Sequence, residues 1–475
     1  MKNKKNFLLH FVGIKGVGMT ALAILARQAG FPVTGSDTEG YFITDEPLKK
    51  AGIRVFSTFD EQHVKSAQLV IATGAHGGFG NPEVVAAKAN GIAVWSQGEA
   101  VGKFMDGTLL TKEPFFGISV AGTHGKTTTT SMIATLFTKL MLDPSYVIGT
   151  SHIASLPGPG HFGKGKYFIA EADEYVTEPN LDKSAKMLWQ HPQIAVVTSV
   201  EFDHPDVYEN ISSVIDAFTQ FVGNLPSSGL LVACGDDENV RSILPRVSCE
   251  VKTYGYSPRN DFVITRVFIS SHQTFFWVKG MGTNLGEFHI NVPGEHNALN
   301  SLATTIVGLE VGQDIEHIKK ALLHYAGAKR RMEYIGQLRS GTKLYDDYAH
   351  HPTEISKTLR AFRHMYPRGR IVCIFQPHTF SRTQKLFDQF VGSFSDADDV
   401  ILLDIFASAR EKHTDEISSM HLGQSMKRVH KSVMYHKSLG EAASYLQDQE
   451  LSDKDIIVTM GAGDVYQLHN ILLKR

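Results

Sequence analysis

The residues with the clearest chemistry lie in one short loop, Gly122-Thr123-His124-Gly125-Lys126-Thr127-Thr128. An apolar, β-branched run at 115–121 precedes it and a helix is expected after it, so the loop joins a strand to a helix N-terminus. Its two glycines let backbone N–H groups close around oxyanions, and the helix N-terminus adds partial positive charge. Lys126 suits the β- and γ-phosphates of a nucleotide, and the Thr127 hydroxyl suits Mg²⁺. The loop predicts a nucleotide site, with an ordinary glycine turn as the alternative.

A second glycine-rich loop, Gly13-Ile14-Lys15-Gly16-Val17-Gly18, follows a short strand expected at 7–12 and precedes a helix expected at about 19–28. Its spacing is G-x-x-G-x-G, whereas the dinucleotide fingerprint is G-x-G-x-x-G, and this difference weakens a nicotinamide interpretation. Asp37, after the next expected strand, suits a ribose hydroxyl or an ordinary turn. Two phosphate loops in one chain indicate a donor and an acceptor substrate.

Carboxylates follow two apolar strands in the middle of the chain. Glu171-Ala172-Asp173-Glu174 comes after the strand expected at 166–170, and Glu201-Phe202-Asp203-His204-Pro205-Asp206 comes after the strand expected at 194–200. The carboxyl ends of strands in an open α/β sheet meet at one edge, so both clusters are expected opposite the phosphate loop. Oxygen ligands there suit divalent cations that neutralise a transferring phosphoryl group.

Polar residues also gather at the ends of later expected elements. The run 293–300 begins a helix, and its amides suit either a base edge or helix capping. The pair Arg330 and Arg331 faces either phosphates or solvent, and the run 344–354 contains three carboxylates and two imidazoles. Strands alternating with helices in this last part of the chain predict a doubly wound parallel sheet whose polar edge faces the nucleotide.

The bulk composition limits the possible classes of protein. A chain of 475 residues predicts two to four domains, and we take three: 1–110, 111–328 and 329–475. Lys and Arg number 47 against 49 Asp and Glu, with no long run of one sign, so nucleic acid is not expected as a partner. Three widely spaced cysteines favour a reducing cytoplasm. No apolar run approaches the roughly 20 residues of a membrane span, so membrane insertion is not expected.

Taken together, the motifs resemble those of the Mur ligases of peptidoglycan synthesis, over essentially the whole chain. The resemblance rests on six stretches: 122–128, 171–174, 203–204, 294–297, 346–354 and 375–378. It implies an α/β protein with three domains: a Rossmann-like UDP-binding domain, a central P-loop ATPase domain with a mainly parallel sheet, and a C-terminal doubly wound α/β domain that brings the amino acid.

The resemblance also implies a reaction: ATP-dependent amide ligation through an acyl phosphate. The stretch Gln376-Pro377-His378-Thr379-Phe380-Ser381-Arg382-Thr383 is similar to the branch of the family that adds L-alanine to UDP-N-acetylmuramate in cell-wall biosynthesis. The two acidic clusters of the central domain are closer to the recycling branch, which joins the tripeptide L-alanyl-γ-D-glutamyl-meso-diaminopimelate to the same UDP-sugar. The acceptor enters through the third domain, so L-alanine is the expected acceptor and the tripeptide is the alternative.

The family pattern further implies a role for individual residues. Lys126 and two Mg²⁺ ions would neutralise charge between ATP and the lactyl carboxylate, with Thr127 on the first ion and Glu171 and His204 on the second. The nucleotide would contact the phosphate loop, His296, Asn297 at adenine, Asp346, and Asp347 at the ribose, with Arg330 or Arg331 near the transferring phosphate. The UDP-sugar and the acceptor would contact the remaining candidates, which are Gly16, Val17, Gly18, Met19, Asp37, His350, His351, His378 and Arg382.

Two other functions fit parts of the sequence. A nucleotide-driven switch or transport ATPase would use the phosphate loop but leaves the 13–18 loop and the His350-His351 pair without a role. A dehydrogenase would use the first loop but has no use for Lys126. The sequence leaves the oligomeric state open between a monomer and a homodimer.

Overall fold

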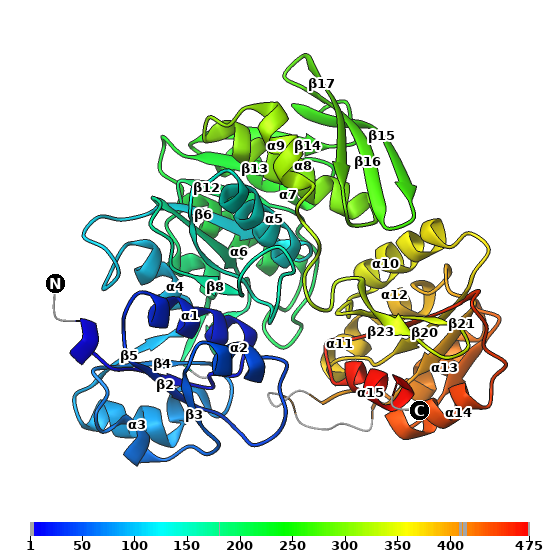
Figure 1. Cartoon of the computed structure of the whole chain (residues 1–475), viewed down its shortest axis with the longest axis horizontal. Helices are drawn as coiled ribbons and strands as arrows, with labels where there is room; N and C mark the ends of the chain where they lie inside the picture. The colour runs from blue at the N-terminus through cyan, green and yellow to red at the C-terminus, as the bar shows by residue number, and fades with distance from the viewer. Residues whose placement is uncertain (1–3, 180, 408–410, 412–415, 474–475) are drawn as a thin grey trace.

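The chain folds into three α/β lobes that follow one another in sequence, each around its own sheet (Figure 1). The computed structural model describes residues 4–179, 181–407, 411 and 416–473. The predicted fold class, α/β with mainly parallel sheets, is confirmed. The exact domain boundaries stay predictions, and we name the N-terminal, central and C-terminal domains by the sheet that each contains.

The N-terminal sheet has five parallel strands in the order β3-β2-β1-β4-β5. Its strands are β1 (Leu9–Val12), β2 (Val33–Ser36), β3 (Arg54–Phe56), β4 (Leu69–Ala72) and β5 (Ala93–Ser96). The helices around it are η1 (Lys4–Asn6), α1 (Val17–Gln28), α2 (Asp45–Lys50), η2 (Glu61–Val64), η3 (Gly78–Gly80), α3 (Pro82–Ala89) and α4 (Gln97–Met105).

The central sheet has ten strands in the order β17-β16-β15-β14-β13-β12-β6-β9-β7-β8, parallel from β15 to β7 and antiparallel at both ends. The strands are β6 (Phe116–Ala121), β7 (Ser145–Val147), β8 (Gly160–His161), β9 (Tyr167–Ala172), β12 (Ile194–Val197), β13 (Leu230–Cys234), β14 (Glu250–Gly255), β15 (Phe262–Ser270), β16 (Gln273–Gly280) and β17 (Thr283–Ile290). A separate hairpin pairs β10 (Val176–Glu178) with β11 (Asp182–Ala185). The helices are α5 (Lys126–Lys139), η4 (Lys186–Trp189), α6 (Ile211–Gly223), α7 (Glu238–Ile243), η5 (Leu244–Arg246), α8 (Glu295–Glu310) and α9 (Ile315–Leu322).

The C-terminal sheet has six strands in the order β18-β19-β23-β20-β21-β22, all parallel except β18. The strands are β18 (Glu333–Gln337), β19 (Lys343–Asp347), β20 (Arg370–Phe375), β21 (Asp399–Leu402), β22 (Val433–Tyr435) and β23 (Asp455–Met460). The helices are α10 (Pro352–Met365), α11 (Phe380–Lys385), α12 (Phe387–Gly392), α13 (Ser419–Met426), α14 (Leu439–Gln447), η6 (Val465–Gln467) and α15 (Leu468–Leu473).

The N-terminal domain shares a hydrophobic core with the central sheet. Phe168 of β9 and Val147 of β7 belong to the same buried cluster as Leu22 of α1 and Phe104 of α4. The apolar faces of α1 and α4 therefore cover one face of the central sheet, and burial of this surface, worth about 25 cal/mol per Å², fixes the two domains together.

The C-terminal domain has a hydrophobic core of its own, and few apolar side chains of the central domain reach it. Phe202 and Ile269 pack against that core and are only partly buried. The remaining contacts between these two domains include buried ion pairs, described below.

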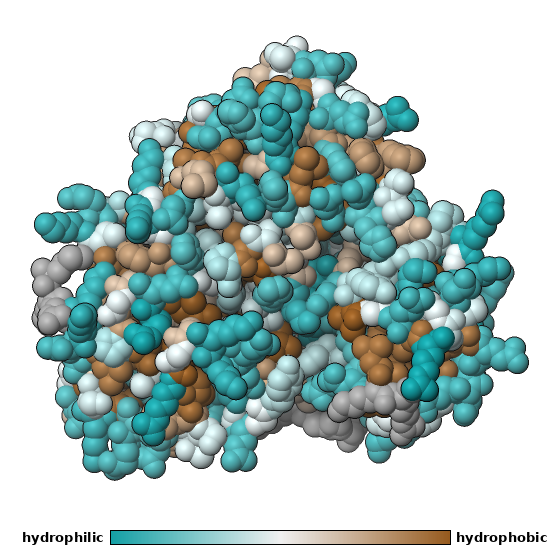
Figure 2. Space-filling model, in the orientation of Figure 1, coloured by the Kyte–Doolittle hydropathy of each residue, from teal (hydrophilic) through white to brown (hydrophobic). Residues whose placement is uncertain are grey.

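Figure 2 shows hydrophilic side chains over most of one face, with hydrophobic side chains in several smaller areas between them. Among the described residues, no helix is long and apolar enough to cross a membrane.

Two helical glycines test how closely the N-terminal and central domains are packed. A Cβ added at Gly102 in α4 would lie 1.9 Å from the carbonyl oxygen of Trp189, whereas a Cβ at Gly223 in α6 would meet nothing within 4 Å. We expect Gly102→Ala to lower the free energy of unfolding by about 1–3 kcal/mol through overpacking. The same change at Gly223 should raise it by about 0.5–1 kcal/mol, because alanine favours a helix. Thermal unfolding of both variants measures the difference, and equal midpoints would contradict the close packing of α4.

Candidate active site

The loop after β6 has the backbone shape expected of a phosphate-binding loop. Gly122 and Gly125 have φ values of +138° and +82°, which L side chains rarely adopt. A Cβ at Gly122 would lie 2.0 Å from Thr198 Oγ1, so neighbouring atoms also exclude a side chain there. Gly125 precedes α5 and offers no side-chain cap, so no capping side chain satisfies the first N–H groups of the helix. These groups are available to an oxyanion.

Lys126 is held in place by a carboxylate. Its Nζ lies 2.7 and 2.9 Å from the two oxygens of Glu174 and also donates to the carbonyl of Gly122 at 2.5 Å. Burial opposes its charge, but Glu174 and Asp173 outweigh that effect and raise the pKa of Lys126. The ammonium therefore stays charged at the mouth of the loop. Glu174 was expected only as one residue of an acidic stretch, and its pairing with Lys126 was not predicted.

Thr127 and Glu171 form a pair of oxygen ligands beside the loop. Thr127 Oγ1 lies 3.2 Å from Glu171 Oε2, and the Gly149 amide donates to the other carboxylate oxygen at 2.6 Å. Burial raises the pKa of Glu171, which the Gly149 amide and Lys126 partly oppose. A hydroxyl and a carboxylate suit the hard Mg²⁺ ion, so the residues present fit the ion that the resemblance implies.

His204 lies among carboxylates. Its Nε2 is 3.7 Å from Glu174 Oε1 and 3.8 Å from Asp203 Oδ2. Its φ of +56° is uncommon for a residue with a side chain, so the fold holds this imidazole at some conformational cost. Burial lowers its pKa, while Asp203 and Glu174 raise it further than burial lowers it. His204 thus contacts Glu174 and Asp203. The Mg²⁺ site that it was expected to share with Glu171 stays a prediction.

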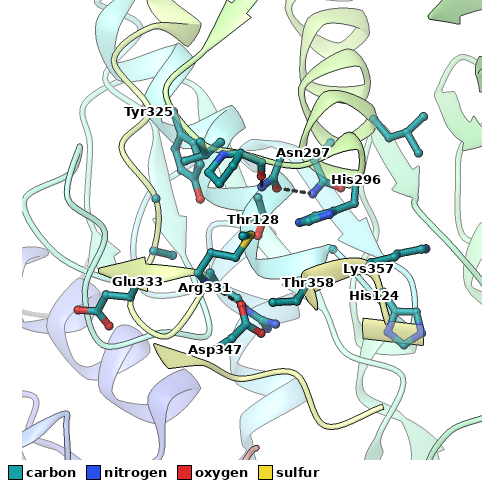
Figure 3. Close-up of a pocket in the computed structure, with 18 of the residues that line it drawn as sticks. His124, Thr128, His296, Asn297, Tyr325, Arg331, Glu333, Asp347, Lys357 and Thr358 are labelled. Carbon is teal, nitrogen blue, oxygen red and sulfur yellow. Dashed lines mark hydrogen bonds between the residues drawn. The ribbon is translucent and has the colours of Figure 1, made fainter. Parts of the chain in front are cut away.

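A cavity of about 370 Å³ opens beside the phosphate loop, lined by both the central and the C-terminal domain (Figure 3). The central domain contributes Thr128, His296, Asn297 and Tyr325, and the following segment contributes Arg331, Asp347 and Lys357. Burial, Lys357 and Arg331 lower the pKa of His296 to about 4, so its ring is neutral near pH 7. The Asn297 side chain donates to the Pro293 carbonyl and receives a hydrogen bond from Asn300, near the start of α8.

The two neighbouring arginines have different roles in the structure. Arg330 is buried, and its three guanidinium nitrogens contact Asp346 at 2.8 Å and the carbonyls of Gly461 and Gly463 at 2.6 and 3.1 Å. Arg331 lines the cavity, and among the described residues no hydrogen bond holds its guanidinium. The sequence left the choice between them open, and this geometry favours Arg331 as the residue near the transferring phosphate.

The neighbouring aspartates separate in the same way. Asp346 is bound to Arg330 and to the Thr459 hydroxyl, and it is absent from the cavity lining. The position of Asp346 differs from the expected contact with the nucleotide. Its carboxylate, on β19, is instead occupied by hydrogen bonds from Arg330 and from Thr459 of β23. Asp347 lines the cavity, and burial raises its pKa to about 6 although Arg331 opposes the shift.

The acceptor candidates gather around Asp203. Arg382 Nε donates to Asp203 Oδ1 at 2.7 Å, and His350 Nε2 lies 3.9 Å from the other oxygen. Arg382 also donates to the His378 carbonyl at 3.1 Å. Burial and Arg382 lower the pKa of His378 well below its usual value, and burial lowers that of His350 to about 4. Both imidazoles are therefore neutral, as a proton acceptor must be.

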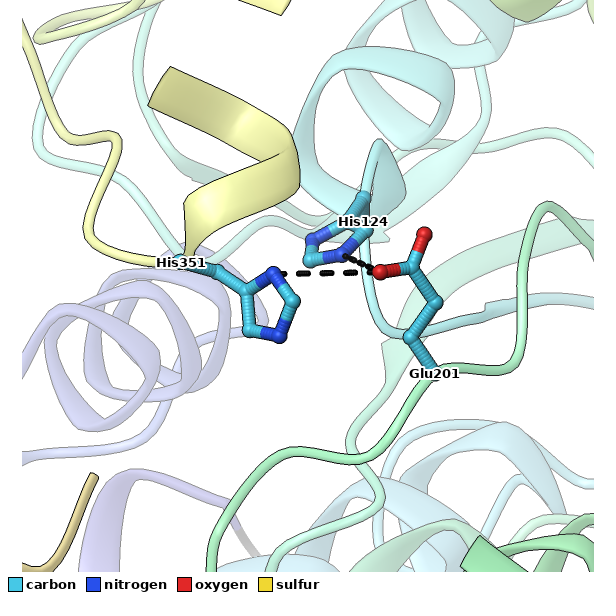
Figure 4. Close-up of side chains that lie close together, drawn as sticks. All are labelled: His124, Glu201 and His351. Carbon is cyan, nitrogen blue, oxygen red and sulfur yellow. Dashed lines mark ion pairs between the residues drawn. The ribbon is translucent and has the colours of Figure 1, made fainter. Parts of the chain in front are cut away.

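His124 and His351 meet at a shared carboxylate (Figure 4). His124 Nε2 and His351 Nδ1 lie 3.4 and 3.8 Å from Glu201 Oε2. Glu354 lies 3.2 Å from the other nitrogen of His124. Burial lowers the pKa of His124, but Glu201 and Glu354 outweigh it and raise the pKa to about 9. Glu201 and Glu354 both lie within stretches expected to contribute to the site, but their pairing with His124 was not predicted.

The glycine-rich loop that begins at Gly13 leads directly into α1, which starts at Val17. Gly16 precedes this helix without a capping side chain, so no side chain occupies the first N–H groups, those of Val17, Gly18 and Met19. The Asp37 carboxylate accepts a hydrogen bond from the backbone amide of Lys15 at 2.7 Å. This bond fits the turn alternative for Asp37 and places its carboxylate next to the loop, where its contact with a ribose stays a prediction.

Three sequence models of one family match successive parts of the chain. Residues 8–108 match the Mur ligase family, catalytic domain, residues 120–308 match the Mur ligase middle domain, and residues 330–463 match the Mur ligase, glutamate ligase domain.

Full-length relatives share the whole architecture. The chain is 38% identical to UDP-N-acetylmuramate–L-alanine ligase of Desulfitobacterium hafniense, covering 98% of this chain and 99% of the relative. It is 39% identical to the ligase of the same name from Acetivibrio thermocellus, covering 98% and 95%. The crystal structure of UDP-N-acetylmuramate-alanine ligase MurC from Thermotoga maritima superposes with a TM-score of 0.79 at 26% identity, covering 98% of each chain. A murein peptide ligase from Psychrobacter arcticus, at 24% identity, shares the fold with a TM-score of 0.71 and covers 98% of each chain. The chain belongs to the Mur ligase family.

Proposed function

We propose that this chain is an ATP-dependent ligase that joins L-alanine to UDP-N-acetylmuramate in peptidoglycan biosynthesis. The observation that carries the proposal is the end-to-end match, at 38% and 39% identity, with relatives of that name. The geometry agrees with it, because a phosphate loop and a cavity meet between the central and C-terminal domains. The N-terminal loop provides a separate place for the UDP diphosphate.

In the first step, the lactyl carboxylate attacks the γ-phosphorus of ATP, an acyl phosphate forms and ADP leaves. Both reactants are anionic, so the step needs fixed positive charge between them. Lys126 supplies one charge, and Arg331, which lines the cavity beside the loop, supplies a second. Thr127 would hold one Mg²⁺ and Glu171 with His204 a second, and the two ions would supply additional charge neutralisation.

In the second step, the amine attacks the acyl carbon and phosphate leaves. Arg382 carries the charge that suits the amino-acid carboxylate, and His378 lies beside it. His350 and His351 are the candidates near the amine, and a neutral ring can accept its proton. Closure of the C-terminal domain excludes water, which protects the acyl phosphate from hydrolysis.

We place the reaction in the cytoplasm, where ATP is available. The three cysteines, Cys234, Cys249 and Cys373, form no disulfide, which agrees with a reducing compartment.

Phosphate release from ATP tests the reaction directly. Purified full-length protein with Mg²⁺ and UDP-N-acetylmuramate is supplied with L-alanine, glycine, L-serine or L-alanyl-γ-D-glutamyl-meso-diaminopimelate in separate reactions. We expect release that requires both the UDP-sugar and L-alanine. Release with the tripeptide alone would assign the chain to cell-wall recycling, and release without any UDP-sugar would contradict the ligase assignment.

The adjacent arginines allow a paired test of the site. We expect Arg331→Met to keep the unfolding midpoint and to lower kcat about a hundredfold, the loss typical of one transition-state donor. Arg330→Met leaves Asp346 buried without its partner and should lower stability by about 3–5 kcal/mol. Steady-state kinetics and thermal unfolding of both variants separate the two roles. Equal losses of kcat in two stable variants would contradict the assignment to Arg331.

The ribose contact proposed for Asp347 predicts a pH dependence of ATP binding. Because its pKa is raised to about 6, the carboxylate is ionised above that pH and becomes neutral as the pH falls through it. A charged acceptor forms the stronger hydrogen bond, so we expect the KM for ATP to rise below pH 6. Asp347→Asn should raise KM roughly tenfold at pH 8 and remove this acid-side rise. An unchanged acid-side rise in the variant would assign the titration to another group.

A further inference from the structure

The roles proposed for His124 at the nucleotide and for His351 near the amine do not explain why these two imidazoles share the carboxylate of Glu201. Among the described residues, this cluster is the one group of His, Cys, Asp and Glu side chains that brings three ligand atoms within 4.8 Å of one another. It combines the phosphate loop, the segment after β12 and the residue that precedes α10. We propose that these three side chains form a binding site for a transition-metal cation of the Zn²⁺ type, separate from the Mg²⁺ ligands proposed above, Thr127, Glu171 and His204.

The outer nitrogens of both imidazoles are already paired as in metal sites. His351 Nε2 lies 3.2 Å from the Phe202 carbonyl oxygen, and His124 Nδ1 lies 3.2 Å from Glu354 Oε1. Histidines that bind a metal generally donate their second N–H to a carbonyl or a carboxylate, which fixes the tautomer and the ring orientation. Here the pairing directs His124 Nε2 and His351 Nδ1 toward Glu201 (Figure 4).

One of the inner nitrogens has no hydrogen-bond partner. The His124 side chain is 10% exposed, and its Nε2 is buried without a hydrogen bond, although it faces Glu201 Oε2 at 3.4 Å. Without a metal this nitrogen is held by the ion pair with Glu201 alone, and a metal would take the place of its proton. A cation between this nitrogen and the carboxylate would give His124 Nε2 a ligand bond. Glu201 Oε2 already accepts a hydrogen bond from the Thr353 hydroxyl at 2.6 Å, and coordination would share this oxygen or replace that bond.

The distances suit a small tetrahedral ion. Ligand atoms about 2.0–2.2 Å from a tetrahedral Zn²⁺ lie roughly 3.4 Å apart. Glu201 Oε2 lies 3.4 Å from His124 Nε2 and 3.8 Å from His351 Nδ1. Shifts of less than an ångström would therefore bring these two pairs of ligand atoms to the separation that a tetrahedral Zn²⁺ requires. His351 Nδ1 now accepts the Thr353 amide at 3.3 Å, and coordination would replace this long helix-capping contact.

The ligand types select the class of ion. Two imidazoles and one carboxylate suit Zn²⁺ and its neighbours, whereas Mg²⁺ prefers oxygen ligands and retains water. The Glu201 side chain is 30% exposed, which gives an ion and a water ligand access to the site. Glu201 and Glu354 together favour positive charge at this position.

Occupation of the site would connect two domains. Glu201 and His124 belong to the central domain, whereas His351 precedes α10 of the C-terminal domain. A bound ion would fix the C-terminal domain against the phosphate loop. Because the site consists only of protein ligands, its occupation does not depend on the proposed ligase reaction.

Co²⁺ is a spectroscopic probe for such a site. The full-length protein in millimolar Mg²⁺, which occupies the oxygen sites, is titrated with Co²⁺ and then with Zn²⁺. We expect a single equivalent of Co²⁺ with the intense visible absorption of four-coordinate geometry, displaced by an equivalent of Zn²⁺. Zn²⁺ should also raise the unfolding midpoint, because a ligand that binds the native state stabilises it.

Two variants remove ligands with little change of shape. Glu201→Gln keeps the size of the side chain, and His351→Asn keeps a good helix-capping residue before Pro352. We expect each to weaken Zn²⁺ binding at least tenfold, measured by competition with a chromophoric chelator. The control His191→Gln removes an imidazole whose side chain is 58% exposed and should bind Zn²⁺ like the wild type.

Three results would overturn the proposal. One is a wild-type protein without the four-coordinate Co²⁺ spectrum in the presence of Mg²⁺. The second is equal Zn²⁺ affinity in the wild type, Glu201→Gln and His351→Asn while all three remain folded. The third is the same loss of affinity in His191→Gln.

Discussion

The ion pair between Arg382 and Asp203 is the contact on which the junction of the central and C-terminal domains depends. Both side chains are buried, and Nε lies 2.7 Å from Oδ1. Despite burial, Arg382 and the surrounding imidazoles hold the pKa of Asp203 well below its usual range. A buried pair of this kind adds little net stability over an apolar contact, but loss of one partner leaves an uncompensated charge. It therefore specifies where the C-terminal domain docks more than how strongly it docks.

The two outer domains are consequently attached in different ways. The N-terminal domain shares an apolar core with the central sheet through α1 and α4, and separation would expose that surface to water. The C-terminal domain meets the central domain largely through charged and polar side chains, whose exposure to water is less unfavourable. This asymmetry would suit the proposed reaction, in which the UDP-sugar is held on a fixed platform and the domain that brings the amino acid opens and closes.

Much of the fold and of the chemistry was predictable from local sequence. The phosphate loop, the carboxylates after β9 and β12 and the polar edge of the third sheet follow from strand, glycine and charge patterns, because parallel strands place their carboxyl ends at one edge. The alternating β-branched and aromatic residues of β15 and β16 are typical of antiparallel strands, so this pairing was also predictable. The continuation of the antiparallel part of the sheet into β17 was not. The whole-chain resemblance to the Mur ligases provided the assignment that such patterns alone do not give.

The partners of individual side chains were not predictable. Arg330 and Arg331 are neighbours in sequence, yet one is bound within the C-terminal domain and the other lines the cavity. Arg330 has a φ of +59°, which is uncommon for a residue with a side chain and which no local sequence pattern indicates. The cluster of His124, Glu201 and His351 comes from three distant segments, so no spacing in the sequence indicates it. Such contacts depend on how the domains dock.

Two cations of the site are already paired with carboxylates in the protein. Lys126 is bound to Glu174, and Arg382 is bound to Asp203. A phosphate or an amino-acid carboxylate that arrives must therefore share or replace an existing partner. This exchange avoids leaving a buried charge without a partner before the substrate binds. Because Glu174 also lies 3.7 Å from His204, movement of Lys126 toward a phosphate would change the environment of that imidazole as well. A chain of contacts therefore runs from Lys126 through Glu174 and His204 to Asp203, which is paired with Arg382 of the C-terminal domain.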